Sequence, residues 1–300
     1  MRSPPALAAV AGVTHRLAVL LKAGVPPASA WAYVAEDAPG VAAAVVAGNP
    51  ARVVDSITSA AADLPVLEGD AWRGLAAAWS VATDAGAPLA SSLRDYASSM
   101  RDLAQVQRDV AVALAGPVAT ARVVMALPLV GLLFGAALGF DTFGVLFGTP
   151  IGIVCLVTSA LLVGVALWWN RRLVASAQPR EATPGLHCEL MAIAVSGGGS
   201  TERARATVSA ALARCGITGE DSQVDAVLAL SSRAGVPAAE LLRSEGDEQR
   251  REARASAQER AAGLAVRLML PLGLCVLPAF IAVGVVPLVM SVISSTIGSF

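Results

Sequence analysis

Long stretches without charge constrain the fold of this chain more than any other feature of its sequence. Between Val123 and Trp169 the only charged residue is Asp141, and none follows Arg267. Three apolar runs of 18, 25 and 26 residues result: Val123–Phe140, Val145–Trp169 and the proline-containing Leu268–Ile293. As helices these runs are roughly 27 to 39 Å long, enough to cross a hydrocarbon core of about 30 Å. We therefore predict three transmembrane helices, at residues 118–140, 145–169 and 266–293.

The charged residues lie on one side of these predicted spans. Residues 1–117 hold 8 Lys/Arg and 10 Asp/Glu, and residues 170–267 hold 13 and 12. Arginines flank the spans on this side, whereas residues 141–144 and the tail 294–300 contain no Lys or Arg. The positive-inside rule therefore places both charged regions in the cytoplasm. Residues 141–144 are predicted to form an external turn, with residues 294–300 as an external tail.

Composition favours helices and argues against several partners. The chain is 55% apolar but only 4% aromatic, so alanine and valine supply most of its hydrophobicity, and alanine is the best helix former. A net charge of −1 argues against nucleic-acid binding through a basic face. The four cysteines show no metal-ligand spacing, and a disulfide framework is not expected in the reducing cytoplasm. We expect an all-α polytopic membrane protein.

One short turn pattern, Ala-Gly-x-Pro, occurs three times. Its glycines are Gly24, Gly86 and Gly235, and Pro88 and Pro237 end the second and third copies. Those two copies are 149 residues apart, and each lies between a predicted helix and a long charged helix that leads to a span. The pattern indicates two tandem cytoplasmic helical-bundle modules, residues 1–117 and 170–265. The alternative is a common helix–helix turn that recurs by composition alone.

The helix predicted to begin at Leu89 carries a seven-residue repeat. Its apolar seam consists of Leu89, Leu93, Tyr96, Met100, Leu103, Gln107, Val110 and Leu114. Two charged stripes share the period: Arg94, Arg101, Arg108 and Asp95, Asp102, Asp109. Because each Arg adjoins an Asp in sequence, the stripes cannot pair with each other at i,i+4. They are either a solvated face or a face that meets a partner.

No motif of catalysis or cofactor binding is evident. The chain lacks the phosphate-binding G-x-x-x-x-G-K-[ST] pattern and has a single lysine, Lys22. His15 and His187 are isolated, although His187-Cys188-Glu189 is a minor candidate for part of a metal site. Asp141 is either an intramembrane acid or, as we favour, a marker of the external turn. We expect no enzymatic activity and no cofactor.

Short motifs along most of the chain resemble the F domain of type II secretion and type IV pilus platform proteins, the GspF family, and especially its Tad/Flp branch. The segments that carry the resemblance are Leu20–Gly24, Asp84–Leu93, Gly116–Pro128, Arg233–Pro237, Arg250–Gln258, Arg267–Pro271 and Leu277–Phe280. Many members have Glu before the glycine turn, where this chain has Asp84 and, in the second copy, Arg233. The second module therefore lacks the acidic residue that the resemblance implies at this position.

The resemblance implies a multi-pass inner-membrane platform that couples a cytoplasmic secretion ATPase to pilin assembly. Its partners would be the ATPase, other platform subunits, pilin and membrane lipid. The candidate partner-facing residues are Asp84, Arg94, Arg101, Arg108, Arg243, Arg250 and Arg254. Two alternatives remain, a membrane transporter subunit and a membrane scaffold that works without a motor.

The predicted topology can be tested with reporter fusions. A reporter fused after Arg180 is expected in the cytoplasm, and one fused after Phe300 is expected on the opposite side, because one predicted span, residues 266–293, lies between the two fusion points. Alkaline phosphatase and fluorescent-protein fusions at both points provide the measurement. Two fusions reporting the same side would contradict the three-span topology.

Overall fold

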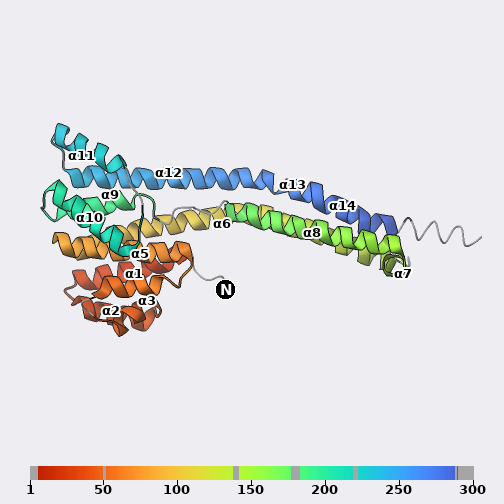
Figure 1. Ribbon diagram of the computed structural model, residues 1–300, viewed down its shortest axis with the longest axis horizontal. Coiled ribbons are helices and arrows are strands. Elements are labelled where there is room, and N and C mark those ends of the chain that lie inside the picture. The colour runs from red at the N-terminus through yellow and green to blue at the C-terminus, as the bar shows by residue number, and fades with distance from the viewer. Residues whose placement is uncertain are drawn as a thin grey trace, which may run out of the picture. The chain divides into compact units, whose positions relative to one another are not determined.

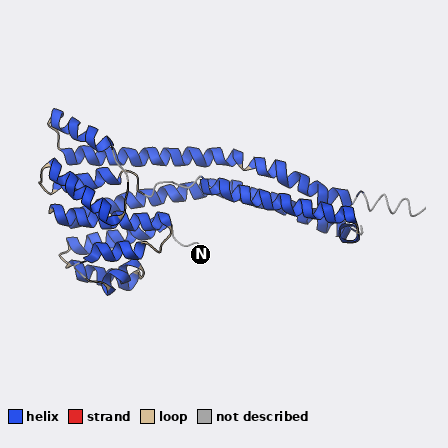
Figure 2. Ribbon diagram, viewed as in Figure 1, coloured by secondary structure: helices blue, strands red, loops and turns tan. Residues whose placement is uncertain are grey.

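The computed structural model describes residues 6–49, 52–137, 142–176, 183–218, 222–287 and 289. Over these residues the secondary structure is helical and contains no strand (Figure 2). The prediction of an all-α chain is confirmed. Asp141 and the tail 294–300, predicted to be external, lie outside the described residues.

The chain divides into two compact units. Unit 1 comprises Met1–Arg108 and Pro179–Ser256, and unit 2 comprises Asp109–Gln178 and Ala257–Phe300. Two long helices have residues in both units, α6 (Leu89–Ala137) and α12 (Ala238–Arg267). The other helices of unit 1 are α1 (Ala6–Lys22), α2 (Pro27–Asp37), α3 (Val41–Ala47), α4 (Val53–Ala61), α5 (Val66–Ala85), α9 (Leu186–Ser196), α10 (Thr201–Cys215) and α11 (Ser222–Ala234) (Figure 1).

Helix α5 is the centre of unit 1. It packs against α1 and α4 from the first part of the chain and against α9 and α10 from the second. Five of its alanines are almost completely buried: Ala71, Ala76, Ala77, Ala78 and Ala82. Their small side chains allow neighbouring helices to approach on several sides, since close packing leaves few voids. Residues from both predicted modules therefore share one hydrophobic core, which runs from Leu7 to Leu242.

Aromatic residues fix α2 and α6 against α5. The rings of Trp31 and Trp79 lie 5.8 Å apart with a tilt of 46°, a geometry that aromatic pairs favour. The buried Tyr96 hydroxyl donates a 2.6 Å hydrogen bond to the carbonyl of Ala71. Gly74 leaves room for this ring, because a Cβ at that position would lie 2.4 Å from the Tyr96 oxygen. Four residues of the predicted apolar seam of α6 belong to the core of unit 1: Leu93, Tyr96, Met100 and Leu103.

The glycines of the three Ala-Gly-x-Pro turns share one backbone conformation. Gly24, Gly86 and Gly235 adopt positive φ angles of 88°, 69° and 67°, and each follows the C-terminus of a helix. Glycine is the residue that takes this left-handed conformation without a steric cost. Pro88 and Pro237 then precede α6 and α12, and their carbonyls accept hydrogen bonds from the first turn of each helix.

Unit 2 is formed by α7 (Thr142–Gly148), α8 (Pro150–Ser176), α13 (Met269–Pro271), η2 (Leu272–Val276), α14 (Leu277–Phe280) and η3 (Ile281–Val285), together with its parts of α6 and α12. We predicted a turn at residues 141–144 followed by a span from residue 145, but a short helix forms first and α8 begins at Pro150. The break has a local cause: the Thr149 hydroxyl accepts a hydrogen bond from the Gly152 amide, which caps α8.

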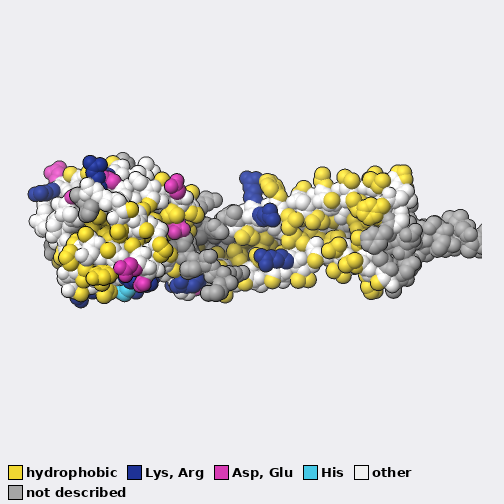
Figure 3. All heavy atoms as spheres, turned by 90° about the horizontal axis from the view of Figure 1, so that it is seen from below, with side chains coloured by type: hydrophobic (Ala, Val, Ile, Leu, Met, Phe, Trp, Pro, Cys, Tyr) yellow, Lys and Arg dark blue, Asp and Glu magenta, His cyan; other side chains and the backbone are white. Residues whose placement is uncertain are grey.

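Three helices of the described chain are long and apolar enough to cross a membrane: Leu89–Phe134, Pro150–Val174 and Ala238–Val285. Hydrophobic side chains cover much of the surface of unit 2 that Figure 3 shows, as expected for contact with lipid. In the third helix the backbone is π-helical over Leu272–Val276 and Ile281–Val285. Prolines cause such irregularity because they lack an amide donor; Pro271 directly precedes the first segment, and Pro278 lies between the two.

Alanine substitutions at the turn glycines test the backbone geometry. We expect Gly86→Ala and Gly235→Ala each to lower the free energy of unfolding by about 1 kcal/mol, because alanine is strained at positive φ. No atom lies within 4 Å of the added Cβ at either position, so the loss reflects backbone strain alone. Gly12→Ala, in the exposed interior of α1 with equal space, is the control and should be neutral or stabilising. Equal effects at all three positions in denaturant unfolding would contradict this account.

Candidate functional site

Glu189 is the one residue of α9 whose burial needs a special explanation. The helix has the sequence LHCELMAIAVS, and eight of its residues are buried. Glu189 is 6% exposed, although a carboxylate is rarely buried without a partner. The packing of α9 against α5 and α10 holds this helix inside the unit, and Glu189 is directed toward residues of α6 and α12. The core of unit 1 therefore contains an acidic group.

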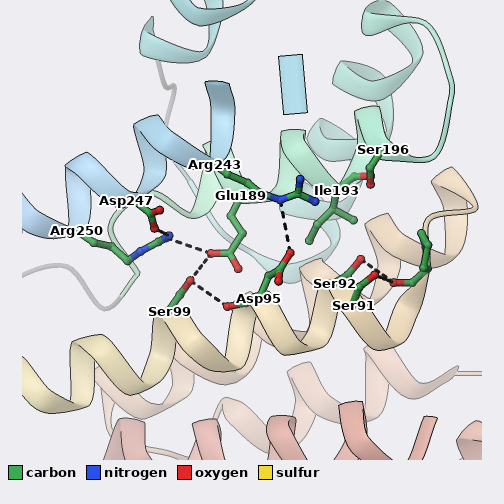
Figure 4. Close-up of polar contacts among 11 residues, drawn as sticks. Ser91, Ser92, Asp95, Ser99, Glu189, Ile193, Ser196, Arg243, Asp247 and Arg250 are labelled. Atoms are coloured by element: carbon green, nitrogen blue, oxygen red, sulfur yellow. Dashed lines mark hydrogen bonds and ion pairs between the residues drawn. The ribbon is translucent and has the colours of Figure 1, made fainter. Parts of the chain in front are cut away.

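Two other helices provide partners for this carboxyl group (Figure 4). The Ser99 hydroxyl, on α6, donates to Glu189 Oε2 at 3.0 Å, and Arg250 Nη1, on α12, lies 3.3 Å from the same oxygen. Arg250 also pairs with Asp247 at 2.6 Å through its other terminal nitrogen. The second carboxyl oxygen, Glu189 Oε1, is buried and has no hydrogen-bond partner in the described part of the chain.

The surroundings of Glu189 favour its neutral form. Burial raises its pKa to about 7, against the opposing effects of Arg250 and the Ser99 hydrogen bond. The negative charges of Asp95 and Asp247 contribute smaller increases to this value. Since one positive partner does not offset the loss of hydration, the carboxyl group titrates near neutral pH.

Glu189 and Arg250 line a cleft of about 210 Å³ within unit 1. Its walls come from α6, α9 and α12 and consist of Asp95, Ser98, Ser99, Asp102, Glu189, Ile193, Leu242, Arg243, Gly246, Asp247 and Arg250. Arg243 Nε lies 3.5 Å from Asp95 Oδ2 at the mouth of the cleft, where both side chains are 45% exposed. The lining thus holds four acidic and two basic side chains, and its charge is negative when all are ionised.

The structure brings together some of the predicted partner-facing residues. Arg243 and Arg250 line the cleft, beside Asp95 and Asp102 of the acidic stripe. Arg254 lies in an adjoining groove lined by Asp102, Leu103, Val106, Asp247, Arg250, Arg251 and Arg254. Arg94 lines neither cavity.

The other predicted partner-facing residues lie outside these cavities. Asp84 is exposed and accepts a 3.1 Å hydrogen bond from Ser80. Arg108 is exposed and donates two hydrogen bonds to Gln105. Arg94 and Arg101 form no ion pair with any residue that the structure describes. The arginine stripe of α6 is thus available to a partner along most of its length.

Sequence reasoning missed the central role of Glu189 and Ser99. It considered Glu189 only as part of a metal site with His187 and Cys188. Among the described residues, however, no group of three or more His, Cys, Asp and Glu side chains is arranged to hold a metal ion. The sequence signal that could have identified Glu189 is its position as the single acidic residue of a mostly apolar helix, because such a residue is a candidate for a buried charge. Ser99 gave no signal, because a serine on a long helix has many roles.

Together these observations define an all-helical membrane protein with a polar cleft in its charged unit. Residues 13–137 match the family model described as type II secretion system (T2SS), protein F. The F-domain resemblance predicted from the sequence is therefore confirmed over that segment, which contains α6 residues of the cleft but neither α9 nor α12. Neither the curated proteins nor the solved structures gave a match to the chain.

The raised pKa of Glu189 predicts how stability depends on pH. Between about pH 4.5 and 7 the folded chain keeps a proton that the unfolded chain releases, so ionisation of Glu189 progressively destabilises the fold as pH rises. Glu189→Gln cannot ionise, so this pH-dependent loss of stability is absent from the variant. The free energy of unfolding of the variant minus that of the wild type should therefore increase by up to about 3 kcal/mol from pH 4.5 to 7.5.

Denaturant unfolding of both proteins in detergent, followed by tryptophan fluorescence, measures this difference. The comparison isolates Glu189, because Asp95, Asp247 and Arg250, the charged groups that act on it, are present in both proteins. A difference that stays constant over this pH range would show that folding does not raise the pKa of Glu189.

Proposed function

We propose that this chain is an inner-membrane platform protein of a type II secretion or type IV pilus system, and that it belongs to the Tad/Flp branch. The observation that carries the proposal is the match of residues 13–137 to the secretion protein F model, in a chain with three helices of membrane-crossing length. The proposed role is mechanical and requires neither catalysis nor a cofactor of its own.

The proposed orientation places both charged regions, residues 1–117 and 170–265, in the cytoplasm. It rests on the distribution of arginine: Arg171 and Arg172 near the end of α8 and Arg267 at the end of α12 are exposed at one end of the apolar segments. Arginine on the cytoplasmic side favours this orientation during insertion. Residues 141–144 and the tail 294–300 would then be external.

Helices α6 and α12 are the proposed mechanical connection to the membrane. Each begins in unit 1, directly after an Ala-Gly-x-Pro turn, and each is part of a helix long enough to span a bilayer. A secretion ATPase that displaces unit 1 would transmit the displacement along these continuous backbones. The spans would contact pilin, lipid and other platform subunits, while nucleic acid is not an expected partner.

The arginine stripe of α6 is the proposed contact with the motor. Arg94→Glu, Arg101→Glu and Arg108→Glu together should reduce pilus assembly or secretion at least tenfold while protein level and membrane insertion stay unchanged. Arg101 and Arg108 are exposed and Arg94 is half-buried, and none of the three has an ion pair within the described chain, so their charges should carry little folding stability. Assembly assays and copurification of the secretion ATPase with the tagged chain provide the measurements.

A matched control reverses three other exposed basic residues, Lys22, Arg52 and Arg203, which lie on or beside α1, α4 and α10. It changes the net charge by the same amount and should assemble normally. Wild-type assembly by the stripe variant would show that the stripe is only a solvated face. Absence of the ATPase from the wild-type complex would instead favour a scaffold without a motor or a transporter subunit.

A further inference from the structure

The cleft lined by Glu189 combines an unsatisfied buried acceptor with an excess of negative charge. Glu189 Oε1 has no hydrogen-bond partner among the described residues, and Figure 4 shows it directed toward the space beside Asp95. An unpaired buried carboxyl oxygen costs free energy, so a donor that reaches it is bound with a corresponding gain. The chain supplies no such donor from its described residues.

The charges in the cleft determine which kind of donor fits. Arg250 is already shared between Glu189 and Asp247, and Arg243 is paired with Asp95. Asp102 lines both this cleft and the adjoining groove and forms no ion pair with a described residue. A cationic donor would satisfy Glu189 Oε1 and offset the charge of Asp102, whereas an anion would meet net repulsion.

The size and walls of the cleft restrict the cation further. A volume of about 210 Å³ lies below the roughly 300 to 1,000 Å³ typical of small-molecule sites. Ile193 and Leu242 form apolar walls beside the acidic groups. A long basic side chain matches both features, because its methylene stem packs on apolar surface while its charged head seeks carboxylates and hydroxyls. The described residues provide no cluster suited to a metal ion.

We propose that this cleft is a docking site for a single arginine or lysine side chain of a partner protein, with Glu189 and Asp102 binding the cationic head and Ser98 and Ser99 adding hydroxyl acceptors. The occupant joins α6, α9 and α12 through one ion-pair network. Its presence stabilises the arrangement in which these three helices surround the cleft. The site concerns the cleft itself and does not require that the partner be a secretion motor.

The test measures binding of amino-acid amides to the purified full-length chain in detergent. The probes are Nα-acetyl-L-arginine amide and Nα-acetyl-L-lysine amide, with Nα-acetyl-L-citrulline amide as the uncharged analogue. We expect saturable binding of at least one cationic probe by calorimetry, and binding of the citrulline probe at least tenfold weaker. Occupancy should also lower the pKa of Glu189, which difference infrared spectroscopy of the carboxyl band detects.

Variants locate the bound probe. Asp102 is exposed, so Asp102→Asn should leave the fold intact while weakening the binding of the cationic probe at least tenfold. Glu189→Gln should weaken the binding by a similar factor. Asp63→Asn is the matched control, since it removes the same charge from an exposed position outside the cleft and should leave the affinity unchanged.

Three results would overturn the proposal. These are equal binding of the citrulline probe, unchanged affinity in Asp102→Asn, and an equal loss in Asp63→Asn that reveals bulk electrostatics. Saturable Ca²⁺ binding that Asp102→Asn weakens, without binding of either cationic probe, would assign the cleft to a metal ion instead. All of these measurements use the isolated chain, so their failure is distinct from failure of the proposed role in secretion or pilus assembly.

Discussion

The packing of α5 is the constraint on which unit 1 depends. Its alanines bring α1 and α4 on one side and α9 and α10 on the other into a shared core. The gain is mainly hydrophobic, at roughly 25 cal/mol for each Å² of apolar surface removed from water. Close approach also requires small side chains at the helix contacts, which α5 provides and a leucine-rich helix would not. Two regions of the chain, separated in sequence by apolar helices, therefore fold as one unit.

The site is a consequence of that packing. Once α9 lies in the core, Glu189 is buried beside α6 and α12, and the free energy of removing a carboxylate from water must be offset by Ser99, Arg250 or a proton. Its raised pKa shows that the offset is incomplete. An incompletely satisfied group of this kind is sensitive to whatever enters the cleft, whether a proton or a charged side chain.

The apolar helices follow a different rule, because lipid gives no hydrophobic drive for their association. Small and polar groups make the contacts instead. The Ser159 hydroxyl donates to the carbonyl of Ala279 at 3.1 Å, and Phe280 lies against Gly131, where a Cβ would come within 2.7 Å of its ring. The Ser159 hydroxyl thus links α8 to the proline-containing third helix through a backbone carbonyl.

Sequence alone determined the helical class, the three apolar helices, the positions of the glycine turns and the apolar seam of α6, because each depends on local periodicity or on the conformational limits of one residue. It did not determine the short helix α7, the shared core of the two predicted modules, or the cleft. Ser99, Glu189 and Arg250 come from three helices, with 90 residues between the first two. No local sequence pattern indicates that the packed core brings Arg250 Nη1 within 3.3 Å of Glu189 Oε2, so tertiary packing alone decided the site.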